Sequence, residues 1–150
     1  MGGVKPISFA LQLEGQAVEL DGGRFWAETR AVPAGADRWP DQLNGIEADG
    51  VLCRRNLELW ADGSLVQAGE ISFGSGNAVT FRARGTLGTS PDPHLRQGTA
   101  VLEVTGGRGR LAGACGFVTS NFLLADTGGL TDYQLGLLFL ERAAQGGGTP

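Results

Sequence analysis

The stretch that decides the fold is residues 51–73, which read VLCRRNLELW, then ADG, then SLVQAGEISF. Its two arms are rich in residues that favour β-strands, and Asp62-Gly63 lies between them. An Asp-Gly pair supplies the left-handed backbone geometry of a tight turn between antiparallel strands. The stretch therefore predicts a β-hairpin. The regions of the chain before and after it also consist of strand-like segments separated by turns.

Short alternating segments separated by glycine-rich turns extend in both directions from this hairpin. Residues 7–15 place Ile7, Phe9, Leu11 and Leu13 on one face of a strand. In AVTFRARGTL, which follows a GSGN turn, the apolar residues face inward and the Thr and Arg residues face outward. Such spacing predicts an all-β domain of about eight or nine strands, without long helices. The two edge strands of a long antiparallel sheet have unpaired backbone groups, and these pair with each other when the sheet closes into a barrel. We therefore expect a closed antiparallel eight-stranded β-barrel.

Composition and length limit the number of domains and the classes of partner. The chain has 150 residues, of which 41% are hydrophobic and 26 are glycine, and its net charge is −4. We expect one barrel domain over residues 1–142 and a flexible tail over 143–150. The acidic balance disfavours a nucleic-acid partner, and no apolar run reaches the ~18 residues of a membrane span. The first residues lack the pattern of a signal peptide, so the prediction is a cytoplasmic protein without a membrane partner.

Two irregular stretches interrupt the strand pattern. Residues 33–50, which include Trp39, are long enough for a lid or binding loop, with disorder as the alternative. Residues 88–98 contain Pro91 and Pro93, which exclude a central strand there. Asp126 and Asp132 flank a Thr-Gly-Gly-Leu stretch, and we interpret both as turn residues.

The cysteines and the single histidine limit the chemistry. Cys53 and Cys115 lie in strand-like segments and are interpreted as buried, reduced thiols. Two thiols and one imidazole, that of His94, are too few ligands for a zinc site, so no metal site is expected. His94 is also the single possible base of a catalytic triad, and no serine lies in the sequence pattern of a nucleophile elbow, so no triad is expected. Motifs for flavin or nicotinamide are absent, so no cofactor is predicted.

The most distinctive motif is TGGRGRLAGACG at residues 105–116. A phosphate-binding glycine loop has to open a helix, whereas the following FVTSNFLL reads as a strand. We therefore interpret the motif as a tight hairpin. It resembles the glycine-rich hairpin of the allene-oxide-cyclase-like and dirigent-like β-barrel families. Arg108 stands where those families usually have a small hydroxyl residue, and Leu111 replaces an aromatic residue.

The resemblance implies a barrel, often a dimer or trimer, with an apolar cavity that acts on hydrophobic small molecules without a cofactor. The predicted function is a cofactor-independent cyclase or isomerase that shapes a hydrophobic secondary-metabolite intermediate, such as a polyketide, by holding it in a reactive conformation. Two alternatives stay open: a non-catalytic carrier of the same kind of ligand, and a structural barrel with a solid interior. A cavity of a few hundred cubic ångströms with converging polar groups would separate the last from the other two.

Candidate site residues are polar or aromatic groups on otherwise apolar strands. The predicted catalytic residues are Tyr133, Asn121 and Glu70, although Glu70 lies opposite Leu65 and Ile71 in phase, which favours a solvent-facing position. The predicted substrate-binding residues are Trp60, Phe81, Trp26, Phe117 and His94. Tyr133 shares its phase with Leu135 and Leu137, so we expect all three to face the same side. Apolar residues on both faces of the last two strands predict that their outer face is covered by another subunit of a homo-oligomer.

Overall fold

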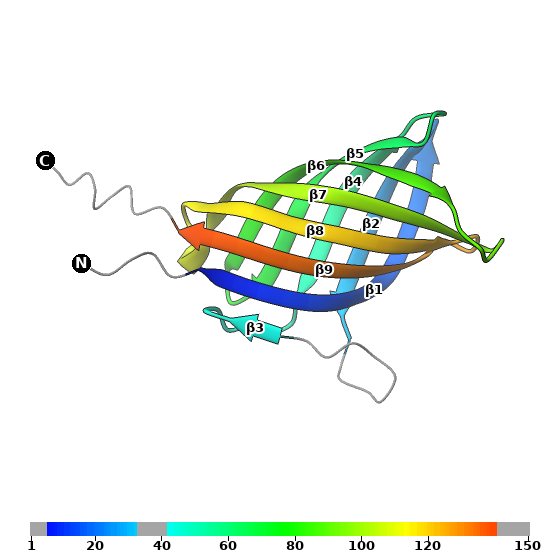
Figure 1. The fold of residues 1–150 in the computed structure, drawn as a ribbon. Coiled ribbons are helices and arrows are strands. Elements are labelled where there is room, and N and C mark those ends of the chain that lie inside the picture. Colours follow the sequence, from blue (N-terminus) through cyan, green and yellow to red (C-terminus); the bar gives the residue numbers. More distant parts are fainter. Residues whose placement is uncertain (1–5, 33–41, 141–150) are drawn as a thin grey trace, which may run out of the picture.

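The computed structural model describes residues 6–32 and 42–140, which form one closed, all-antiparallel β-barrel (Figure 1). The strands are β1 (Ile7–Asp21), β2 (Arg24–Ala31), β3 (Gln42–Asn44), β4 (Leu52–Leu59), β5 (Ser64–Gly74), β6 (Asn77–Thr89), β7 (Leu95–Arg108), β8 (Ala114–Ala125) and β9 (Gly129–Leu140). They are arranged in the order β2-β4-β5-β6-β7-β8-β9-β1, and pairing of β1 with β2 closes the ring of eight. The predicted fold class is confirmed.

Strand β1 is long enough to serve three neighbours. Its residues 7–16 pair with β9, residues 13–21 pair with β2, and Ser8–Ala10 pair with the short β3. β3 thus occupies the flank of β1 that β2 leaves open at the start of the strand. Residues 33–41, which include Trp39, lie outside the described residues, as do the whole of the predicted tail and the first five residues.

The hairpin that decided the fold forms as the sequence predicts. β4 and β5 pair from Leu52↔Ser72 to Leu59↔Leu65, with the Asp-Gly turn between them, and Gly63 has a φ of +89°. The second irregular stretch is shorter than predicted. β6 extends to Thr89 and β7 begins at Leu95, so only residues 90–94, which hold both prolines, lie outside strands.

The strands coil around the barrel at glycines that face a neighbouring strand. A Cβ at Gly69 would lie 2.1 Å from the carbonyl oxygen of Arg54, and one at Gly85 would lie 2.0 Å from that of Thr99. Any side chain at these two positions would push the strands apart. The glycine-rich motif at 105–116 ends β7, makes a three-residue 3-10 turn at Gly109–Leu111, and enters β8. The strand β8 follows the turn directly, which agrees with the hairpin interpretation.

Two apolar clusters fill the barrel, one toward each end. The larger contains Phe9, Leu11, Ile71, Phe73 and Val79, and the rings of Phe9 and Phe73 meet edge to face with centroids 5.5 Å apart. The smaller contains Ala27, Leu65, Leu87, Phe122 and Leu130. Between them, along β2, β4, β5, β8 and β9, lies a layer of fully buried polar side chains. The two ends of the barrel therefore differ in the apolar residues that fill them.

Candidate functional site

Two of the three predicted catalytic residues lie together, but on the outside of the barrel. Asn121 on β8 pairs in register with Tyr133 on β9. Asn121 is exposed and Tyr133 is half-buried, and both alternate with inward residues. As the sequence predicts, Tyr133 faces the same side as Leu135 and Leu137, and that side is the outer surface.

Glu70, the third predicted catalytic residue, also faces outward. Its carboxylate accepts hydrogen bonds from Arg108 Nη1 at 2.5 Å and Nη2 at 3.2 Å. This bidentate pair joins β5 to the end of β7 on the outer surface. The solvent-facing alternative for Glu70 therefore describes its position.

The predicted substrate-binding residues are dispersed over the molecule. Phe81 is only 3% exposed and packs in the larger core cluster, whereas Trp60, Trp26 and Phe117 are exposed on outer surfaces. His94 lies in the 90–94 loop, where its Nδ1 is 3.0 Å from the carboxylate of Asp126. The structure does not bring these five residues to one place.

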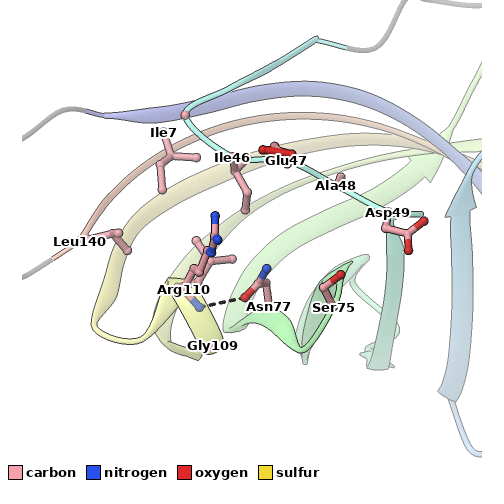
Figure 2. A pocket seen from close by; sticks show the side chains of 12 residues that line it. Ile7, Ile46, Glu47, Ala48, Asp49, Ser75, Asn77, Gly109, Arg110 and Leu140 are labelled. Carbon is pink, nitrogen blue, oxygen red and sulfur yellow. Dashed lines mark hydrogen bonds between the residues drawn. The ribbon is translucent and has the colours of Figure 1, made fainter.

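A groove lies instead over the end of the barrel where β1 starts and β9 ends, here called the first mouth (Figure 2). Its volume is about 990 Å³, which falls in the upper part of the usual range for small-molecule sites. The apolar floor is made by Ile7, Ile46, Leu111 and Leu140. The polar border is made by Glu47, Asp49, Ser75, Asn77 and Arg110.

Three chain segments that are distant in sequence form this groove. The segment 45–50 crosses the mouth and is tied to β5 by a hydrogen bond from the Asp49 amide to the Phe73 carbonyl, at 2.8 Å. The β5–β6 turn and the 3-10 turn are joined where Asn77 Oδ1 accepts the Arg110 amide at 2.8 Å, as Figure 2 shows. Gly109, with a φ of +67°, gives the chain the left-handed turn that brings Arg110 there.

The groove offers charges of both signs. Glu47, Asp49 and Arg110 are exposed, and no ion pair within residues 6–32 and 42–140 engages any of them. A carboxylate there can accept or return a proton. A guanidinium can stabilise negative charge on an oxygen, and does so more strongly where a bound ligand excludes water.

The second polar feature is the buried layer in the middle of the barrel, here called the interior network. Asp132 is 0% exposed and receives three hydrogen bonds: from Arg55 at 2.5 Å, from Ser120 at 2.6 Å and from Gln134 at 2.9 Å. Arg55, 1% exposed, also donates to Gln67 Oε1 at 3.2 Å. The interpretation of Asp132 as a turn residue is wrong, because β9 begins at Gly129 and Asp132 points inward from it.

Burial and neighbouring charges act on two groups of this network. Desolvation raises the pKa of the Cys53 thiol, so the thiol stays protonated at neutral pH. Burial works against the charged form of Arg55, yet its interactions with Cys53 and Asp132 hold its pKa above the usual value. Arg55 and Asp132 therefore form a buried ion pair with no net charge.

The cysteines are only partly where the sequence predicts them. Both are free thiols, with Cys53 buried and Cys115 half-buried on the outward side of β8. Among the described residues, no group of three or more His, Cys, Asp and Glu side chains is placed to hold a metal ion.

Sequence reasoning missed both polar sites, for different reasons. The interior network had a signal, since Arg55 shares its phase with Val51, Cys53 and Leu57, and Gln67 shares the phase of Leu65. A polar residue in phase with a buried face is the mark of an inward side chain. The groove gave no signal in the sequence, because it is assembled by three turns whose relative positions depend on closure of the barrel.

No family model, curated protein or solved structure matches this chain. The likeness to allene-oxide-cyclase-like barrels therefore stays a prediction. Within the described ranges, no helix has both the length and the apolar character needed to cross a membrane.

Proposed function

We propose that the protein binds a hydrophobic small molecule in the groove of the first mouth and acts on it as a cofactor-independent cyclase or isomerase. The observation that carries the proposal is the groove itself: about 990 Å³ with an apolar floor and with carboxylates and a guanidinium at its border. An apolar body with a few polar groups is the kind of ligand that such a lining suits. The glycine-rich hairpin that resembles cyclase barrels supplies Arg110 to this groove.

The groove has the groups that an isomerisation needs. A carboxylate of Glu47 or Asp49 removes a proton from the carbon that lies between a substrate carbonyl and a carbon–carbon double bond, and the Arg110 guanidinium stabilises the oxygen of the resulting dienolate. The carboxylic acid then returns the proton to the far carbon of that double bond, and the double bond moves into conjugation with the carbonyl, so atoms and electrons balance without an oxidant or a cofactor. Ile46 and Leu111 would hold the apolar part of the substrate in a folded conformation, which lowers the entropic cost of ring closure.

Binding is tested first with an amphipathic probe, 8-anilinonaphthalene-1-sulfonate, whose fluorescence rises in apolar surroundings. The substitution Ile46→Asp places a charge on the groove floor and is expected to weaken probe binding at least tenfold. The matched control is Val18→Asp, which places the same charge on the outer surface of β1, where Val18 is 55% exposed. Equal binding by wild type and Ile46→Asp would place the probe outside the groove and contradict the proposal.

The mass and the chromatographic retention time of the ligand distinguish an enzyme from a carrier that only binds it. Native mass spectrometry of the expressed protein identifies bound molecules, which are then incubated with wild type, Glu47→Gln, Asp49→Asn and Arg110→Gln. An isomerase changes the chromatographic retention of its substrate without changing its mass, and at least one of these variants is expected to retain binding and lose that change. Binding without any change in retention would establish the carrier alternative.

We also propose that the protein self-associates through the outer face of β7–β9. Five large apolar side chains there are 38–58% exposed: Val101, Phe117, Leu135, Leu137 and Phe139. They are contiguous, because Phe117 pairs in register with Leu137 and Cys115 with Phe139. Together they offer roughly 400 Å² of apolar surface, at the scale that marks interaction sites and about half of the ~800 Å² that each partner contributes to a standard interface.

A second copy of the chain is the proposed occupant of this face, because an isologous contact buries the same apolar strip on both subunits and leaves the exposed polar residues Glu103 and Asn121 at its border. Sedimentation velocity is expected to show a dimer that Phe117→Asp and Leu137→Asp convert to monomer. The control Val18→Asp, at an equally exposed position on β1, leaves the assembly intact. A wild-type monomer at micromolar concentration would overturn the proposal.

The compartment proposed for the protein is the cytoplasm. Both cysteines are free, and Cys53 faces the interior while Cys115 lies on the outward side of β8. Unpaired thiols are the rule in a reducing compartment. Localisation of a tagged full-length chain by cell fractionation tests this directly.

A further inference from the structure

The interior network contains polar atoms that the protein itself does not satisfy. Four buried side-chain atoms have no hydrogen-bond partner within the described residues: Thr29 Oγ1, Arg55 Nε, Gln67 Nε2 and Gln134 Oε1. Each belongs to a side chain that is at most 4% exposed. An unpaired buried polar group costs about 1–3 kcal/mol, so four of them in one layer indicate a partner that is not part of the chain.

These four residues belong to one layer of the barrel. Arg55 contacts both Gln67 and Asp132, and Gln134 donates to the same oxygen of Asp132 as Arg55 does. Thr29 pairs in register with Cys53, and Gln134 Nε2 lies 3.9 Å from the Cys53 sulfur. Thr29 lies near the thiol and lowers its pKa slightly, less than any other neighbour does. The Thr29 hydroxyl nevertheless makes no hydrogen bond of normal geometry within the described residues.

The chemistry of the unpaired atoms defines what they accept. Arg55 Nε and Gln67 Nε2 are donors, Gln134 Oε1 is an acceptor, and the Thr29 hydroxyl can be either. An oxygen that accepts hydrogen bonds and also donates one matches this set. The occupant has no net charge, because Asp132 already neutralises the Arg55 guanidinium and a second anion would be buried without a counter-ion.

We infer that the interior network is a second binding site, distinct from the groove, which takes one or two neutral hydroxyl-type oxygens. Two sources share this chemistry: water, and the hydroxyl end of a small alcohol. The larger core cluster lies between the network and the groove of the first mouth. On the other side, the smaller cluster and its neighbours line a wholly apolar opening, here called the second mouth, where Leu57, Leu65, Leu87, Phe122 and Leu130 leave a cavity of about 20 Å³.

The opening is apolar and too small for an alkyl chain, so an alcohol would enter only if the leucines move apart, whereas a water needs only the unpaired polar atoms of the network. Three polar residues of the network lie two positions along their strands from an apolar residue of the second mouth: Arg55 from Leu57, Gln67 from Leu65, and Asp132 from Leu130. An alcohol that enters from this end would place its alkyl chain among the leucines and its hydroxyl on the network.

The experiment is water-selective NOE spectroscopy on the full-length protein, alone and with 1-butanol or butyrate. Cross-peaks between long-lived water and the Gln67 and Gln134 side-chain amides support the site with water as the source. Loss of these cross-peaks on addition of 1-butanol, with shifts of the Leu65 and Leu130 methyl signals, identifies the alcohol as a second source. Absence of both effects overturns the inference, and displacement by butyrate as effective as that by 1-butanol overturns the neutrality argument.

A second measurement uses the sign of a stability change. If the Thr29 hydroxyl bonds to a bound oxygen, Thr29→Val lowers the melting temperature, whereas removal of an unpaired buried hydroxyl raises it. Thr86→Val, at an exposed position on β6, is the control and is expected to leave the melting temperature unchanged. A higher melting temperature for Thr29→Val would contradict an occupied site at that hydroxyl.

Discussion

Strands β6 and β9 belong to the same barrel but distribute their polar residues differently. β6 directs apolar residues inward and polar residues outward: Val79, Phe81 and Ala83 inside, Thr80, Arg82 and Arg84 outside. β9 directs two polar residues inward, Asp132 and Gln134, between the core residues Leu130 and Leu138, and it exposes the apolar residues Leu135, Leu137 and Phe139 on its outer side. Alternation is equally regular in both strands, so strand formation alone does not decide which face becomes the core.

The difference shows where the fold departs from maximal stability. A buried ion pair is often no more stable than well-packed apolar residues of the same volume, and an apolar outer face has to be covered or tolerate contact with water. β9 carries both features, whereas β6 carries neither. This contrast supports the proposals that the interior network binds a ligand and that the outer face of β7–β9 contacts a second subunit.

The largest expected effect comes from breaking the inward polar group of β9. Asp132→Leu leaves the Arg55 guanidinium buried without its partner and is expected to cost about 3–5 kcal/mol of unfolding free energy. Arg82→Leu, which breaks the exposed Arg82–Glu103 pair on β6, is expected to change it by less than about 1 kcal/mol. Urea denaturation measures both.

The double variant Arg55→Met/Asp132→Leu is the control for this prediction. It removes both charges, so it is expected to recover much of the stability that Asp132→Leu loses. A single Asp132→Leu variant as stable as wild type would show that β9 tolerates an apolar interior and would remove the basis of the comparison.

Two phenylalanines test the apolar side of the same contrast. Phe81→Ala creates a cavity in the larger core cluster and is expected to destabilise the protein by about 3–5 kcal/mol. Phe117 on β8 is 56% exposed, and Phe117→Ala is expected to cost under about 1 kcal/mol under conditions where the protein is monomeric. Thermal or urea unfolding at low protein concentration compares the two, and similar losses would mean that Phe117 is already packed within one subunit.

Prediction from sequence succeeded where one face was consistently apolar. The β4–β5 hairpin, the sidedness of β6 and closure of the ring followed from alternation, turn residues and the need to protect edges. On β9 the same reasoning did not show which face is inward, because apolar residues occur on both faces of the strand. Tyr133 was correctly grouped with Leu135 and Leu137, but alternation gives a grouping and not a direction.

The sites were harder to predict than the strands. Asp132 reads as a turn residue because it lies three residues after Gly129, and its inward direction depends on the partners that β4 and β8 bring to it. Arg54 and Arg55 are adjacent and identical in sequence. Arg55 can be identified as the inward arginine only because it lies on the same face of the strand as Cys53 and Leu57. The groove of the first mouth depends on contacts between turns, which no local pattern encodes.

The two cysteines give an inward and an outward thiol for direct comparison. Under conditions where the protein is monomeric, the native chain is expected to react rapidly with dithionitrobenzoate at half-buried Cys115 and slowly, through opening, at buried Cys53, with both reacting when unfolded. Because burial raises the pKa of the Cys53 thiol above the usual 9.0, the folded state retains its proton at pH values where the unfolded state loses it. That contribution to stability is complete below about pH 9 and falls as the pH rises through the folded pKa.

The measurement is the unfolding free energy of wild type and Cys53→Ala between about pH 8 and pH 10.5, where thiols in the unfolded chain ionise. Wild type is expected to lose stability more steeply with rising pH than Cys53→Ala does, and Cys115→Ala, which leaves Cys53 in place, is expected to follow wild type. Parallel curves for all three would show that Cys53 is not protected by the interior.

The smallest expected effect is at the exposed Arg108–Glu70 pair, which is the outward counterpart of the buried Arg55–Asp132 pair. Both are short and charged, but the side chains of Arg108 and Glu70 are 60% and 30% exposed against 1% and 0% for Arg55 and Asp132. A double-mutant cycle with Arg108→Ala and Glu70→Ala is expected to give a coupling of about 0.2–1 kcal/mol that decreases in high salt. The cycle with Arg55→Met and Asp132→Leu is expected to give a larger coupling with little salt dependence, because the interior excludes ions and water. If the two cycles gave equal couplings with equal salt dependence, the interior network would be accessible to solvent, and its contrast with the outer surface would disappear.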